Sequence, residues 1–171
     1  MIERKNGFPK CWFRGLSIFC GAVVLFVISS CSAEPEEVLQ YLEDGTVSRR
    51  HFEVDGKKQG MMTDYYPNGS IRGERWFVDD QQEGRTVWYY PDGMKRESQF
   101  FEKNLQTGPD SMWMEEGSLQ RVIMFQNGKK HGPMRTWSET GELILEVIYE
   151  RDSLLAIHRT LAQRDTLGGV E

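Results

Sequence analysis

Glycine recurs with a period of 24 residues through most of this 171-residue chain. Two series keep the same register, one at Gly45, Gly69, Gly93, Gly117 and Gly141 and the other at Gly60, Gly84, Gly108 and Gly132. A fixed period of this length is typical of repeat proteins, in which each unit packs only against its neighbours. We therefore predict an array of similar units, not a fold around one central core.

Apolar side chains follow the same period. One aromatic column contains Tyr41, Tyr65, Tyr89, Trp113 and Trp137; a second column contains Phe52, Trp76, Phe100, Met124 and Ile148; a third contains Phe77, Phe101, Phe125 and Tyr149; an aliphatic column contains Val47, Ile71, Leu119 and Leu143. In a sheet, side chains of one column would lie in rows across the strands and pack against each other. The pattern alone does not tell which face of that sheet is exposed to solvent.

Each unit has the composition of a β-hairpin. Asn68-Gly69 and Asp92-Gly93 each follow a proline, and both pairs are strong turn signals. The runs between turns, such as 70–78 and 85–90, have the length of strands and are rich in β-branched and aromatic residues. We predict an all-β fold, an elongated single-layer antiparallel β-meander of repeated hairpins, over residues 41–152.

The repeat becomes irregular after residue 152, and 153–171 is predicted to be a degenerate cap and tail. Ala156 stands where the second glycine series would continue, and Asp165 where the first would. Terminal repeats that depart from the pattern usually close the array. Residues 153–163 fit either a closing strand or a short amphipathic helix, and the sequence leaves both open.

Residues 1–30 have the organisation of a signal peptide. A basic stretch from Arg4 to Arg14 precedes an apolar run at 16–28, which is too short to cross a bilayer comfortably. The four residues that follow, Ile28-Ser29-Ser30-Cys31, resemble the bacterial lipobox. That resemblance implies a diacylglycerol attached to Cys31 and cleavage just before it. An uncleaved membrane anchor with an incidental cysteine is the alternative.

The predicted lipid anchor also implies a location. Residues 31–40 would be an acylated tether, and the repeat array would lie outside the cytoplasm. Ser32 follows the cysteine, and in Gram-negative lipoproteins a serine there is compatible with the outer membrane or its periplasmic face. In a host without an outer membrane, the anchor would be in the plasma membrane.

Two segments carry a family resemblance. Tyr65-Tyr-Pro-Asn-Gly69 and Phe125-Gln-Asn-Gly-Lys-Lys-His-Gly132 resemble MORN repeats, and most closely the bacterial variant, whose members are often labelled antitoxin-like. The resemblance covers about residues 41–150 and implies binding or scaffolding, not catalysis. The second glycine of the eukaryotic Gly-x-Gly pair is missing after Gly60, Gly84, Gly108 and Gly132. Phospholipid binding of the eukaryotic kind is therefore not implied.

Nothing in the sequence has the pattern of a catalytic, cofactor or metal site. Cys11 and Cys20 would leave with the signal peptide, and Cys31 would be acylated. His51, His131 and His158 have no metal-ligand spacing, and no nucleophile elbow is present. The net charge is −5, and residues 1–30 carry +3, so the remainder of the chain carries −5 − 3 = −8. An acidic chain of this kind lacks the basic surface of a nucleic-acid binder.

Two functions are therefore considered. The first is a membrane-anchored, non-enzymatic scaffold that binds a protein or an envelope polymer. The second is an antitoxin or immunity-type protein that neutralises a partner. The oligomeric state is not indicated by the sequence.

Overall fold

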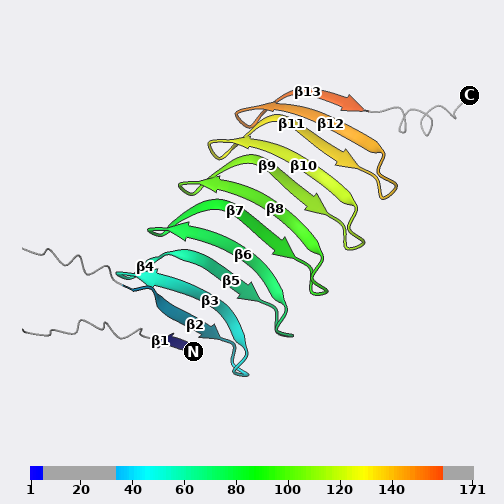
Figure 1. Ribbon diagram of the computed structural model, residues 1–171. Coiled ribbons are helices and arrows are strands. Elements are labelled where there is room, and N and C mark those ends of the chain that lie inside the picture. The colour runs from blue at the N-terminus through cyan, green and yellow to red at the C-terminus, as the bar shows by residue number, and fades with distance from the viewer. Residues whose placement is uncertain (6–33, 160–171) are drawn as a thin grey trace, which may run out of the picture.

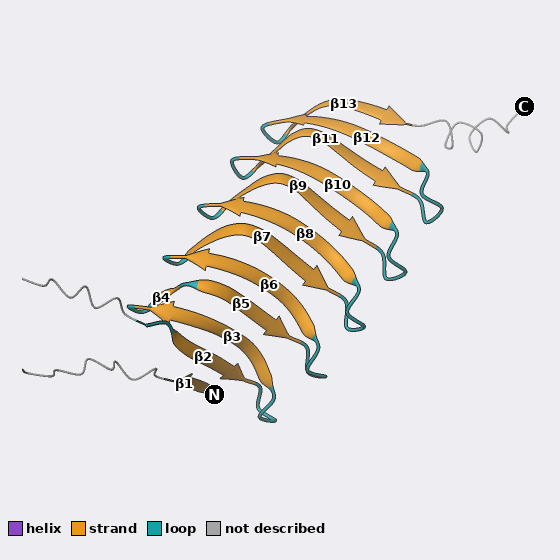
Figure 2. Cartoon of the chain, in the orientation of Figure 1, coloured by secondary structure: helices purple, strands orange, loops and turns teal. Residues whose placement is uncertain are grey.

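The computed structural model describes residues 1–5 and 34–159. All of the regular elements described there are strands (Figure 2). They are β1 (Ile2–Lys5), β2 (Glu36–Tyr41), β3 (Val47–Val54), β4 (Lys57–Lys58), β5 (Gly60–Tyr65), β6 (Ile71–Val78), β7 (Gln81–Tyr89), β8 (Lys95–Glu102), β9 (Leu105–Trp113), β10 (Leu119–Gln126), β11 (Lys129–Trp137), β12 (Leu143–Glu150) and β13 (Ser153–Arg159).

The strands form one open antiparallel sheet in chain order, and the short β4 pairs with β3 beside this path. Figure 1 shows an elongated single layer in which each strand is bent into an arc, with β1 and β13 at opposite ends. The all-β meander predicted from the repeat is therefore confirmed. No helix in the described part of the chain is long and apolar enough to cross a membrane.

Tight two-residue turns at one end of the strands connect β6 to β7, β8 to β9 and β10 to β11. At Asp79-Asp80, Lys103-Asn104 and Asn127-Gly128, both residues of the pair have positive φ angles between 49° and 77°. This is the backbone of a type I′ turn, whose twist matches that of the paired strands, and Asn, Asp and Gly adopt it most easily. The recurring polar pairs of the sequence are thus the hairpin turns.

Longer turns at the opposite end of the strands contain the glycines of the first series. The Tyr66 amide donates to the Ser70 carbonyl at 2.8 Å, and the Gly69 amide donates to the Tyr66 carbonyl at 2.9 Å. The Asn68 side chain accepts the Ser70 amide at 3.0 Å. Gly69 has a φ of 83°, which a residue with a Cβ adopts at a cost.

The second glycine series forms β-bulges in the strands. Around Gly84, Glu74 pairs with Val87 and Trp76 pairs with Glu83, so three residues of β7 lie opposite Arg75. Gly84 has a φ of 69°. The equivalent irregularity recurs between β8 and β9 and between β10 and β11. Bulges of this kind bend a strand and increase its twist, which is consistent with the arched strands of Figure 1.

The last strand departs from this register. Residues 153–159 form strand β13, so the closing strand is the correct one of the two alternatives. Ala156 has no positive φ, and only one extra residue is inserted between β12 and β13. One period earlier, Ile123 lies opposite Met134, so the repeat would place His158 opposite Val147. In the structure Ile157 lies opposite Val147. Alanine resists the left-handed backbone, and the smaller insertion turns the side chains of β13 to the other face.

The sheet also begins earlier than the predicted array boundary at residue 41. Residues 36–40, predicted to be part of the tether, instead belong to β2, which pairs with β3 and in which Val38 and Leu39 are buried. β1 pairs with β2 and comes from the segment predicted to be a signal peptide. Leu16 to Ile28 and Cys31 lie outside the described residues.

Candidate binding face

The two faces of the single-layer sheet differ in chemistry. Residues directly opposite in an antiparallel pair, and residues two apart along a strand, point to the same face. One face carries most of the buried hydrophobic residues together with buried ion pairs and amides, and we call it the network face; it includes Asp64, Arg75, Trp88, Glu97 and Asp110. The other face carries exposed apolar side chains, and we call it the stripe face; it includes Met61, Trp76, Phe100 and Leu105.

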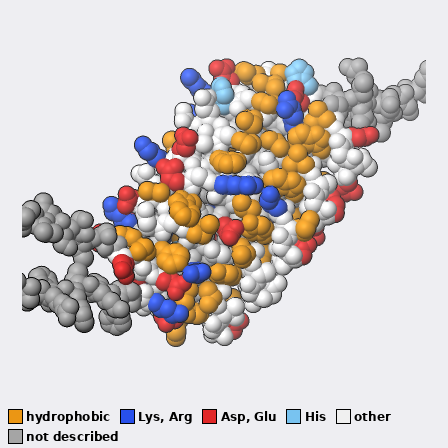
Figure 3. All heavy atoms as spheres, viewed as in Figure 1, with side chains coloured by type: hydrophobic (Ala, Val, Ile, Leu, Met, Phe, Trp, Pro, Cys, Tyr) orange, Lys and Arg blue, Asp and Glu red, His pale blue; other side chains and the backbone are white. Residues whose placement is uncertain are grey.

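The stripe face presents large apolar side chains to solvent. Met61 and Trp76 are cross-strand partners in β5 and β6, and they are 38% and 45% exposed. Phe100 in β8 is 37% exposed and lies opposite Arg85 on one side and Thr107 on the other. Leu105 is 49% exposed. Figure 3, which views one face of the sheet, shows how hydrophobic side chains gather in a band across successive strands.

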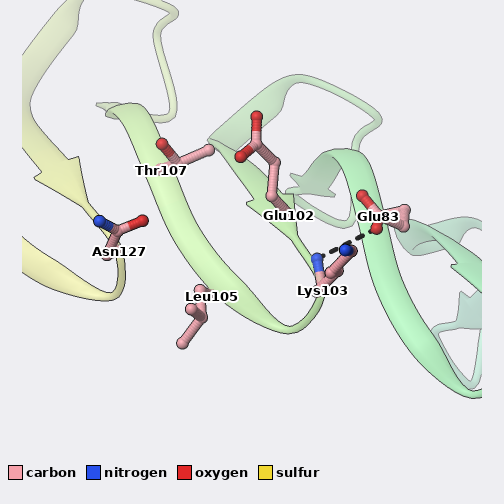
Figure 4. A pocket seen from close by; sticks show the side chains of 6 residues that line it. All are labelled: Glu83, Glu102, Lys103, Leu105, Thr107 and Asn127. Atoms are coloured by element: carbon pink, nitrogen blue, oxygen red, sulfur yellow. Dashed lines mark hydrogen bonds between the residues drawn. The ribbon is translucent and has the colours of Figure 1, made fainter.

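A shallow hollow lies at the turn end of the stripe face. Its lining residues come from β7, β8, β9 and the turns beside them: Glu83, Glu102, Lys103, Leu105, Thr107 and Asn127 (Figure 4). The Glu83 carboxylate accepts the Lys103 amide at 3.1 Å. The hollow is open on one side, so it could receive a side chain of a partner protein but would not enclose a small molecule.

The network face is tied together by a buried carboxylate. Asp64 is 1% exposed and accepts from Arg49 Nε at 2.6 Å and from the Arg75 guanidinium. The Arg75 guanidinium in turn lies 5.2 Å from the centre of the Trp88 ring. A buried charge is tolerated when it is paired and hydrogen-bonded. These contacts join four consecutive strands and leave Asp64 no free oxygen, so the cluster is structural.

A second acidic group lies further along the network face. Asp110 is buried and accepts from the side-chain amides of Gln99 at 3.2 Å and Gln106 at 2.9 Å. Burial, together with the negative charge of Asp110, raises the pKa of Glu97 above its usual value. No group of three or more His, Cys, Asp or Glu among the described residues could hold a metal ion.

The three histidines are not brought together. His131 and His158 are exposed, whereas His51 is buried and its Nε2 lies 3.0 Å from a Glu53 oxygen. Burial favours the neutral form of Glu53, but hydrogen bonds from His51 and Arg4 outweigh it and lower the pKa of Glu53. The predicted site residue Cys31 lies outside the described residues.

Sequence reasoning found the aromatic columns but not their exposure. The column of Trp76 and Phe100 faces solvent, while the adjacent column of Phe77 lies on the opposite face and is more buried. Only the strand register separates the two, because neighbouring positions along a strand point to opposite faces. The Asp64 cluster was also missed, since its three charged residues come from three different strands.

The fold and the stripe face define an elongated single-layer β-repeat protein with an exposed apolar surface. Residues 58–77 and 82–103 match the MORN repeat variant, so these two segments are similar to MORN-type repeats. The two matched segments include Met61, Trp76 and Phe100 of the stripe face. Repeats of this type are generally binding modules and not enzymes. No curated protein matched the sequence.

Proposed function

We propose that this chain is a membrane-anchored lipoprotein, attached through an acylated Cys31, whose repeat array is a non-enzymatic scaffold for a protein partner. The observation that carries the binding role is the exposed stripe of Met61, Trp76 and Phe100. Large aromatic side chains that remain exposed are typical of protein interfaces, where tryptophan contributes strongly to affinity.

The architecture supports a scaffold role. In the described part of the chain no second layer covers the stripe face, so a partner can bury the stripe without any rearrangement of these strands. The stripe runs across β5, β6 and β8, and the Asp64 cluster on the opposite face links β5 and β6 to their neighbours β3 and β7. A partner would therefore meet a surface that is already organised, which lowers the entropic cost of binding.

The anchor part of the proposal rests on the sequence. The basic stretch, the short apolar run and Ile28-Ser29-Ser30-Cys31 have the order of a lipoprotein signal peptide. An array beginning at residue 36 would leave only a few tether residues after Cys31, which would hold the sheet close to the membrane surface. An envelope polymer is the other ligand class that such a position would offer.

A second candidate function is a cytoplasmic protein of the antitoxin type that neutralises a partner. One observation favours it: β1, from the start of the chain, pairs with β2 of the repeat array. These two strands can meet only if both lie in the same compartment. Export with removal of residues 1–30 would separate them, so the two functions differ in the fate of β1.

The binding role is tested by photo-crosslinking in living cells. A benzoylphenylalanine replaces Trp76 in the full chain, and a matched variant carries it at Glu139, an exposed turn position away from the stripe. We expect a discrete adduct of one partner from position 76 and none from position 139. Adducts of the same proteins at both positions, or no adduct at either, would contradict a binding role for the stripe.

A further inference from the structure

The outer edge of β2 is occupied in the full chain by a strand that export would remove. β1 pairs with β2 in an antiparallel register, with Ile2 opposite Gln40, Glu3 opposite Leu39, Arg4 opposite Val38 and Lys5 opposite Glu37. The Tyr41 amide donates to the Met1 carbonyl at 2.9 Å. A five-residue segment thus completes the edge of a long sheet with main-chain hydrogen bonds.

Side-chain contacts make this pairing selective for charge. Arg4 Nη1 lies 2.8 Å from a Glu53 oxygen and 3.5 Å from a Glu36 oxygen. Its position opposite Val38 places the guanidinium on the network face, where Glu36 and Glu53 also lie. On the stripe face, the Tyr41 hydroxyl donates to a Glu3 oxygen at 2.6 Å. The edge therefore accepts a strand with an acidic residue followed by a basic one.

Loss of β1 would leave these groups without their present partners. Glu36 would lose its cation, and Glu53 would keep only the contact with His51 at 3.0 Å. The main-chain groups on the outer side of β2 would also become free. An unpaired edge strand readily accepts another strand by β-augmentation, in which the main chain supplies affinity and the side chains supply specificity.

We infer that the outer edge of β2 is a docking site for an antiparallel strand of a partner protein that carries a guanidinium or ammonium group opposite Val38. The inference rests on the proposed export and cleavage, which open the edge. β1 occupies the same site in the unprocessed chain and mimics the partner. The two carboxylates Glu36 and Glu53 select the cationic side chain, and Tyr41 selects an acceptor at the preceding position.

Two unprocessed full-length proteins give a matched test. Cys31→Ala keeps β1 in place, and Cys31→Ala combined with Arg4→Glu places a carboxylate against Glu36 and Glu53 and displaces β1. The probe is a synthetic peptide of residues 1–5 in which benzoylphenylalanine replaces Ile2. We expect the protein with Arg4→Glu to be labelled at least tenfold more than the protein that retains Arg4, with the label mapped by mass spectrometry to residues 36–41.

A control peptide that carries glutamate in place of Arg4 should label neither protein. Equal labelling of the two proteins, a label outside β2, or no capture by the opened edge would overturn the inference. A second copy of the chain crosslinked at β2 would assign the edge to a homodimer and would also overturn it. The processed lipoprotein should behave like the Arg4→Glu protein.

The intact mass of the chain from membranes is measured separately. A chain that is never cleaved would refute the proposed anchor and leave the peptide experiment on the full-length proteins unaffected. An edge that captures no peptide would refute the docking site whatever the mass shows. The two failures are therefore distinguishable.

Discussion

At the scale of single residues, close packing on the network face depends on a missing side chain. Gly73 in β6 lies directly opposite Trp88 in β7, and the indole ring covers the glycine. A Cβ built at Gly73 would be 2.3 Å from Trp88 Cε3. Gly73 does not have a positive φ, so the ring, and not the backbone, excludes a larger residue here. Arg75 then packs on the same indole.

Gly73→Ala should therefore destabilise the protein. Overpacking of a close contact costs about 1–3 kcal/mol, and part of this is offset because alanine restricts the unfolded chain. The free energy of unfolding from urea titration measures the effect. In a Trp88→Ala background the same substitution should cost nothing, and an equal cost in both backgrounds would show that the indole is not the cause.

Glu97 makes stability dependent on pH. Burial and the charge of Asp110 raise the pKa of Glu97 in the folded state, so between the unfolded and the folded pKa the folded protein holds a proton that the unfolded chain has released. The stabilisation from this proton is complete below the unfolded pKa of about 4.3 and is lost as pH rises through the folded pKa.

Glu97→Gln stays uncharged at every pH and should raise the free energy of unfolding at pH 7 relative to the wild type, with no gain below pH ~4. Chemical denaturation across this pH range measures both values. Glu139→Gln, at an exposed turn, is the control and should follow the wild type. A gain at pH 7 that persists unchanged in acid would contradict the assignment to Glu97 ionisation.

At the scale of elements, hydrogen bonds between successive hairpins hold the meander together. The side-chain oxygen Oδ1 of Asn104 accepts from the main-chain N–H of Gln82 at 2.7 Å, and the main-chain N–H of Asn104 donates to the main-chain carbonyl of Gln82 at 3.0 Å. Asp80 and Asp152 repeat this pair of contacts with Lys58 and Lys130. Gly128 stands at the same position and makes only the main-chain contact, to Gln106 at 2.8 Å.

Gly128→Asn should therefore stabilise the array by about 0.5–1.5 kcal/mol, because it adds the missing side-chain acceptor for the main-chain N–H of Gln106. Asparagine tolerates the positive φ of 77° better than most residues do. Thermal unfolding measures the gain. Gly128→Ala has the same backbone strain without the acceptor and should be destabilising; a stabilising alanine would show that the hydrogen bond is not responsible.

The element scale is also where the sequence was most informative. Period and turn chemistry predicted the hairpins, because each depends on residues close together in the chain. The register of β13 was not predictable in the same way: at Ala156 the bulge inserts one extra residue where the other periods insert two, which reverses the faces of Ile157 and His158. The exposure of Trp76 was likewise undetermined, since it depends on what lies across the strands and on the absence of a second layer.

At the scale of the whole molecule, the protein is an open sheet with two faces and two edges. The network face holds neighbouring strands together through Asp64, and the stripe face leaves Trp76 and Phe100 exposed. The β2 edge is covered by β1 in the full chain. The fate of the first thirty residues thus decides both where the array is located and which of its edges is free.

The most direct measurement of the proposed function is the intact mass and location of the chain in its native host, for the wild type and for Cys31→Ala with a C-terminal tag. We predict that the wild type begins at Cys31, carries an acyl modification and is found in the membrane fraction, whereas Cys31→Ala keeps its N-terminal segment and is not acylated. A wild-type chain that retains residues 1–30, carries no lipid and is found in the cytoplasm would contradict the account and favour the antitoxin-type alternative.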